Sequence, residues 1–168
     1  HRVVSAHDQS ATDWHFPCTG SGHCPDYYGD DEYVNQAAVD RMMADGLKQL
    51  TGTTSLVSAW QTILPDYEPG RIIAVKVNFN DSIAGGTYGY IDSDAYVDAL
   101  PQIINSMVEG LLTIGVQQQD IWVYDISRYI PDRFRERINF DQIRYVDRYG
   151  NGDDVQAATF TNTDPSAQ

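Results

Sequence analysis

The chain is poor in cysteine and in basic residues, and it contains no apolar run long enough to cross a membrane. Only two of its 168 residues are cysteines, and 11 lysines and arginines stand against 24 aspartates and glutamates, for a net charge of −13. Nucleic acids and anionic membrane surfaces attract clustered cations, so we expect neither as a partner. A transmembrane helix needs about 20 consecutive apolar residues, so we expect no membrane insertion.

Several signatures of enzymes and metal sites are missing as well. No Gly-x-Gly-x-x-Gly or Walker lysine loop follows an apolar segment, and no Gly-x-Ser-x-Gly elbow is present. Asp92, Asp94 and Asp98 imitate the start of a calcium loop, but Val97 and Ile103 stand where that loop needs a glycine and an acid. The motifs therefore indicate no nucleotide site, no serine hydrolase and no EF-hand.

The two cysteines, Cys18 and Cys24, frame a short glycine-rich loop. We predict a local disulfide, which would place the protein outside the cytosol, in an extracellular or periplasmic setting. The chain starts on a strand-like His1-Arg-Val-Val and not on a signal peptide, so we expect a processed end. Two free thiols, or a metal site that includes neighbouring histidines, stay open as alternatives. The spacing between the cysteines is not that of a zinc site.

All four histidines lie in the first 24 residues of the chain. This bunching makes the region the expected place for a transition metal, if the protein binds one. The candidate metal ligands are His7, His15 and His23.

The pattern of apolar residues predicts alternating strands and helices. Strands are expected at 2–6, 71–79, 121–125 and 142–146, and helices at 32–50, 55–64, 95–114 and 131–138. A long loop spans 9–32. Long crossovers between strands are typical of a mostly parallel sheet with helices on both faces. The sequence thus predicts one α/β domain over 1–150, a Rossmann-like three-layer fold, followed by a polar tail at 151–168.

Polar residues stand where three of the predicted strands end. His7 and Asp8 follow the first strand, Lys76 and Asn78 share one face of the second, and Asp125 to Arg128 close the third. Open α/β sheets bind ligands at the carboxyl edge of their strands. The candidate site therefore comprises His7, Asp8, Lys76, Asn78, Asp125 and Arg128. Lys76 with Asp125 is expected to form either a catalytic pair or a structural ion pair.

Several of these segments resemble a known family. Val3-Val-Ser-Ala-His7-Asp8, Ala74-Val-Lys-Val-Asn-Phe-Asn80 and Asp120-Ile-Trp-Val-Tyr-Asp-Ile-Ser-Arg128 look like the amino-terminal part of the secreted branch of domain-of-unknown-function family 362. The resemblance covers about residues 2 to 150. It implies an exported α/β protein, and some members carry iron–sulfur domains, for which this chain lacks the cysteines.

Family members are longer than this chain, so the resemblance implies an incomplete fold. The chain is then a short paralogue, a processed fragment or one subunit of an assembly. An uncovered sheet invites association. We therefore expect an exported, acidic, structural or binding module that forms an oligomer with itself or joins a second protein chain. The alternative is an enzyme that acts on a small molecule or uses a metal at the carboxyl edge of the sheet. The sequence names no cofactor.

Overall fold

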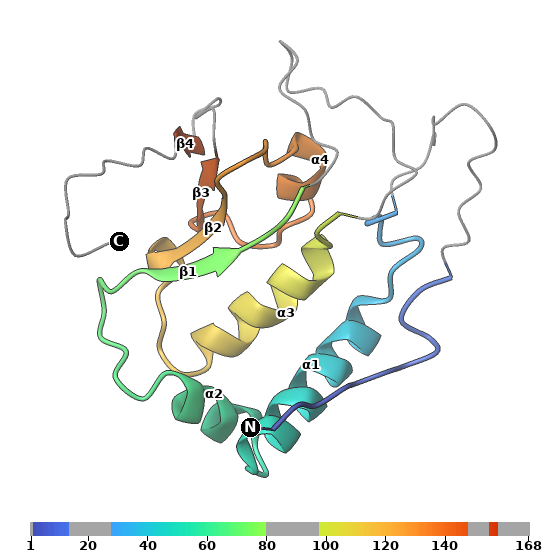
Figure 1. Cartoon of the computed structure of the whole chain (residues 1–168), viewed down its shortest axis with the longest axis vertical. Helices are drawn as coiled ribbons and strands as arrows, with labels where there is room; N and C mark the ends of the chain where they lie inside the picture. Colours follow the sequence, from blue (N-terminus) through green and yellow to red (C-terminus); the bar gives the residue numbers. More distant parts are fainter. Residues whose placement is uncertain (1, 14–27, 80–97, 148–154, 158–168) are drawn as a thin grey trace.

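The computed structural model describes residues 2–13, 28–79, 98–147 and, for the backbone only, 155–157. Within these ranges four α-helices, a short 3-10 helix and four strands follow one another (Figure 1). In chain order they are α1 (Gln36–Thr51), α2 (Leu56–Ile63), β1 (Ile73–Lys76), α3 (Pro101–Leu112), η1 (Gln118–Asp120), β2 (Ile121–Asp125), α4 (Asp132–Arg135), β3 (Arg144–Asp147) and β4 (Val155–Ala157).

The four strands form one parallel sheet in the order β1-β2-β3-β4. Every pair of neighbours is parallel, with Lys76 opposite Tyr124 and Asp125 opposite Asp147. The predicted α/β class with a parallel sheet is confirmed. β4 lies in the stretch 151–168 that the sequence presents as a polar tail, and it pairs there with β3.

One face of the sheet carries the hydrophobic core. Alternate residues of β1 and its continuation, among them Val75 and Phe79, are buried there, as are Ile121 and Val123 of β2. α3 and α4 both pack on this face, and Phe134 of α4 meets Phe79 edge to face with ring centroids 5.0 Å apart. α1 and α2 pack against α3, on the side away from the sheet (Figure 1).

The opposite face of the sheet has no helix on it in the part of the chain that the structure describes. Ala74, Lys76 and Arg144 on this open face are exposed, and Trp122 and Tyr124 are half-buried. Because β1-α3-β2 and β2-α4-β3 place their crossovers on the same side, the helical layer expected on the second face is not formed by the described residues. The sheet is open, as expected of an incomplete α/β fold.

The helix ends follow local sequence signals. α1 is capped by Asn35, whose side chain accepts from the Ala38 backbone N–H at 3.3 Å. It ends at Gly52, which takes a positive φ of 74°. α3 starts with Pro101 in its first turn, where a missing N–H costs nothing.

The predicted first strand is wrong. Residues 2–8 have no regular secondary structure and run along α1, where the Arg2 side chain donates to the Gln49 carbonyl at 2.9 Å (Figure 1). Val3 and Val4 favour a strand, but such a segment forms one only beside a neighbour that pairs with its backbone. No described strand lies next to it.

Candidate functional site

The carboxyl edge of the sheet is where sequence reasoning placed the site, and two buried carboxylates meet there. Asp125 ends β2 and Asp147 ends β3, and the two residues are register partners. Their exposed fractions are 2% and 0%. Sequence reasoning found Asp125 and missed Asp147, although Asp147 follows its strand in the same way.

The Asp125 carboxylate accepts hydrogen bonds from two segments of the chain. One oxygen accepts from the Phe79 N–H at 2.8 Å, which ties the end of β1 to β2. The other accepts from the N–H and hydroxyl of Ser127, both at 2.8 Å, and from the Arg128 N–H at 3.2 Å. Four donors satisfy this carboxylate, so it holds the edge of the sheet in shape. The residue is 2% exposed, so the carboxylate faces its own chain and not the solvent.

Asp147 performs a similar task one strand further on. It accepts from the backbone N–H of Ile130 at 3.3 Å, which fixes the segment that leads into α4. The two carboxylates thus anchor the loops that leave β1 and β2. Buried acceptors of backbone N–H groups are a common device for stabilising loop ends.

Lys76 and Asn78 do not join Asp125. Lys76 lies opposite Tyr124 in the register, so its side chain leaves the sheet on the face opposite to that of Asp125. The Lys76 ammonium instead donates to the Asn78 side-chain oxygen, and both residues are exposed. The predicted pairing of Lys76 with Asp125 is therefore wrong, whether as a catalytic pair or as an ion pair.

His7 and Asp8 do not reach this edge through a strand either. His7 is exposed, and Asp8 pairs with Arg41 of α1 at 2.8 Å. Hydrogen bonds from the Ser10 hydroxyl and N–H, with help from Arg41, lower the pKa of Asp8 to about 2. The histidine, lysine and aspartate thus do not gather at a common rim.

Of the remaining candidate residues, the structure describes Arg128 only. Arg128 is half-buried at the carboxyl edge, and its side chain donates to the Ser127 carbonyl at 3.3 Å. His15, His23, Cys18 and Cys24 lie outside the described residues, so the predicted disulfide stays a prediction. Within the described ranges, no group of three or more histidines, cysteines or acids is arranged to hold a metal ion. No described helix is long and apolar enough to span a bilayer.

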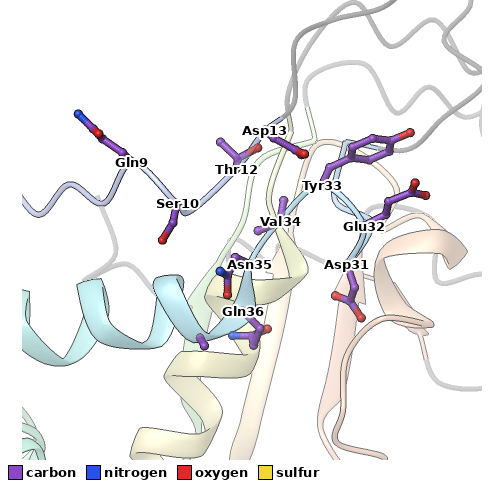
Figure 2. A pocket seen from close by; sticks show the side chains of 11 residues that line it. Gln9, Ser10, Thr12, Asp13, Asp31, Glu32, Tyr33, Val34, Asn35 and Gln36 are labelled. Carbon is purple, nitrogen blue, oxygen red and sulfur yellow. The ribbon is translucent and has the colours of Figure 1, made fainter.

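A polar pocket of about 630 Å³ lies between residues 9–13 and the start of α1. Figure 2 shows three acidic side chains around it, those of Asp13, Asp31 and Glu32, and they do not converge on one point. Asp31 accepts from the buried Gln102 side chain at 2.9 Å. The pocket therefore lacks a focused set of ligands.

A groove of about 670 Å³ runs beside β1. Six consecutive residues, 73–78, line it together with Ile63 of α2 and with Ile103 and Met107 of α3. Side chains of a strand alternate between faces, so a cavity that meets every residue in turn lies along the edge of the backbone. β1 has β2 on one side and no described strand on the other.

No protein-family model matches this chain, and no curated protein or solved structure matches it. The class defined by the structure is an α/β protein with an open, parallel sheet. The resemblance to family 362 stays a prediction that rests on the segments quoted above.

Proposed function

We propose that this protein is a structural or binding subunit, which buries the open face of its sheet against a second polypeptide. The observation that carries the proposal is that all described helices lie on one side of a parallel sheet. Parallel sheets occur almost only with both faces covered. Assembly with another copy, or with another chain, would supply the missing cover.

The residues of the open face are of the kinds found in the centres of interfaces. Trp122 and Tyr124 stand on β2, and the Arg144 guanidinium lies over the Trp122 ring at 5.8 Å from its centroid. Ile72, which leads into β1, is 55% exposed. Aromatic residues and arginine are enriched in protein–protein interfaces and carry much of their binding energy.

A setting outside the cytosol is part of the same proposal. It rests on the predicted disulfide between Cys18 and Cys24, on the acidic composition and on the resemblance to an exported family. Alkylation of the native protein with and without prior reduction tests it. Cysteines that react only after reduction support the proposal, and two cysteines that react at once remove its main support.

The enzyme alternative has less support. It needs His7, Lys76 and Asp125 to act together, but His7 lies beside α1, and Lys76 and Asp125 project from opposite faces. Asp125 is also buried, and its carboxylate accepts four hydrogen bonds from its own chain. No described constellation of these residues resembles an acid–base pair or an activated nucleophile.

The test of the proposal is a charge on the open face. Tyr124→Glu places a carboxylate across from Lys76, its register partner, so the single chain tolerates it. We expect the variant to keep its circular dichroism spectrum and to lose assembly, as measured by light scattering. Val57→Glu, at a 40% exposed position on α2, is the matched control and should assemble as the unaltered protein does. Equal masses for the two variants would refute assembly through this face.

A further inference from the structure

The open edge of β1 presents backbone groups that a further strand could pair with. The Val77 N–H donates to the Tyr124 carbonyl at 2.9 Å, so the odd-numbered residues of this segment face β2. In a parallel ladder the alternate residues face the other way. The N–H and C=O groups of Ala74 and Lys76 therefore point into the groove beside β1. Beyond them the Asn78 carbonyl accepts from the Ala99 N–H at 3.2 Å, which closes the groove at its carboxyl end.

The walls of this groove are apolar and open to water. Ile63 at the end of α2 is 39% exposed, and Ile103 on α3 is 40% exposed. An extended peptide that added to β1 would satisfy the backbone groups and bury these side chains together. Strand addition to an exposed edge is a common mode of peptide recognition.

Residues 2–6 have the properties of such a peptide. The segment Arg-Val-Val-Ser-Ala carries two β-branched residues and is long enough to pair along the four residues of β1. Val3 is 92% exposed, the highest value among the large apolar side chains described. The segment thus leaves a strand-forming side chain in water.

The segment already lies next to the groove and points in the required direction. Val4 and Ala6 share a small cavity with Ile103, which also lines the groove. Residues 2–8 run against the direction of α1, because Arg2 meets Gln49 and Asp8 meets Arg41. α1 and α3 run the same way (Figure 1), and α3 returns antiparallel to β1 in its β-α-β unit. Residues 2–6 are therefore parallel to β1.

Charges at the two ends favour the same orientation. Parallel addition brings Arg2 to the amino end of β1, where Asp66 and Glu68 are exposed. It brings Asp8 towards the other end, where Lys76 is exposed. An antiparallel strand would reverse both pairings. Complementary charges of this kind fix the register and direction of an incoming strand.

We propose that the open edge of β1 takes up residues 2–6 of a second copy of this chain as an added parallel strand. In its own chain the segment is held on α1 by the ion pair between Asp8 and Arg41 and by the pairing of Ala11 and Asp13 with Tyr33 and Asn35. These contacts keep the segment on α1 and away from β1 of its own chain. The groove of a second copy is not tied to this position and can approach the segment there. This inference goes beyond assembly through the open face and does not rest on it, because it concerns the edge of the sheet.

The first experiment places a charge on the segment itself. Val3→Asp changes a side chain that lies in water, so the single chain should fold as before. We expect sedimentation equilibrium of the full chain to show self-association weakened about tenfold or more, because an aspartate cannot enter an apolar groove. Val57→Asp is the matched control and should associate like the unaltered protein. Equal association of both variants would overturn the proposal.

The second experiment fills the groove from outside. A fluorescein-labelled peptide of residues 2–8 should bind the Val3→Asp protein, which we measure as a rise in the fluorescence anisotropy of the peptide. The groove of this variant is free because the introduced aspartate keeps the segment of a second copy out of it. Ile63→Lys introduces a charge into the wall and should abolish the binding. Hydrogen exchange at Ala74 and Lys76 should slow when the unaltered protein associates.

Three results would overturn the proposal. One is a peptide that does not bind the Val3→Asp protein, or that binds the Val3→Asp and Ile63→Lys proteins equally. Another is slow exchange at Ala74 and Lys76 in a monomer, which would mean that the chain covers its own edge. The third is assembly that is lost in Tyr124→Glu and intact in Val3→Asp, which would leave the open face as the contact. The opposite pattern would support the edge and refute the face.

Discussion

Asp125 is the residue that most shapes the carboxyl edge of this sheet. Its carboxylate joins Phe79, just after β1, to the turn at Ser127 and Arg128 that follows β2. A buried anion is tolerated at this position because N–H and O–H donors surround it. The feature that first suggested a catalytic role thus has a structural explanation.

A direct consequence concerns the amide analogue of this residue. Asp125→Asn keeps the shape but turns an accepting oxygen into an NH₂ group that faces donors. We expect a loss of about 1–3 kcal/mol in the free energy of unfolding, measured with urea. Ser127→Ala removes only one of the donors and should cost about 0.5–1.5 kcal/mol. If Asp125→Asn is as stable as the unaltered protein, the structural explanation fails.

Asp120 gives a prediction about pH. The Tyr67 hydroxyl at 2.6 Å and the Gly70 N–H at 2.7 Å both donate to one oxygen of this buried carboxylate. These hydrogen bonds, the tyrosine's first, hold the pKa of Asp120 below its ordinary value of 3.8. Burial and the same carboxylate raise the pKa of Tyr67. The charged form of Asp120 is therefore the one that stabilises the fold.

Because the pKa of Asp120 is lowered on folding, its contribution to stability is complete above pH 3.8 and is lost as the pH falls through the folded value. The difference in unfolding free energy between the unaltered protein and Asp120→Asn should thus shrink on acidification. Urea unfolding of both proteins at neutral pH and near pH 3 measures this difference in free energy. Glu68→Gln in the same loop is the control. A difference that stays constant with pH would contradict the assignment.

At the residue scale the sequence identified the polar groups but not their directions. Lys76 and Asn78 alternate with the apolar Val75, Val77 and Phe79, which is typical of a strand with one face in water. That alternation was a usable signal. Whether Lys76 faces Asp125 depends on the register between β1 and β2, and the sequence of a single strand does not determine that register.

At the scale of elements, the crossing of α2 and α3 depends on a glycine. A Cβ atom at Gly110 would lie far inside van der Waals contact with the indole nitrogen of Trp60. The Trp60 ring is itself 5% exposed and part of the core. A methyl group at this position must therefore push the two helices apart.

We expect Gly110→Ala to destabilise the fold by about 1–3 kcal/mol, despite its better helix propensity. Gly46→Ala is the matched control: it lies within α1, and its added methyl group would meet its nearest neighbour at 3.9 Å. That variant should be unchanged or more stable by up to about 1 kcal/mol. Adding Trp60→Phe to Gly110→Ala should restore part of the loss. Equal thermal midpoints for the two glycine variants would refute the close approach.

The elements themselves were largely predictable from the sequence. Residues 121–125 form a strand as predicted, and α1 and α2 lie close to the predicted ranges. α3 lies inside the predicted range 95–114 but begins only at Pro101. These segments have strong apolar periodicity, which is a local property. The segment 2–6 has strand-forming residues but no described strand beside it. The sequence of β4 has no clear strand pattern, but β4 lies beside β3 and pairs with it. Pairing between distant segments decided both cases.

At the scale of the whole molecule, the described residues form a parallel sheet with helices on one face. The core lies between the sheet and the helices α3 and α4. The other face of the sheet presents Trp122 and Tyr124 to solvent, together with the basic side chains of Lys76 and Arg144. The alternation in β1 indicates that one face of that strand meets water, but the one-sided layer of helices follows from strand order and the handedness of the crossovers. The predicted role as an assembling module rests on it.

The most direct test is hydroxyl-radical footprinting of the full chain over a range of protein concentrations. Trp60, buried in the core, serves as the internal reference for a protected aromatic side chain. We predict that oxidation of Trp122 and Tyr124 falls towards the level of Trp60 as the concentration rises, while Val57 on α2 stays accessible. Oxidation of Trp122 and Tyr124 that does not change with concentration would contradict the account, because a face that stays in water has no second polypeptide on it.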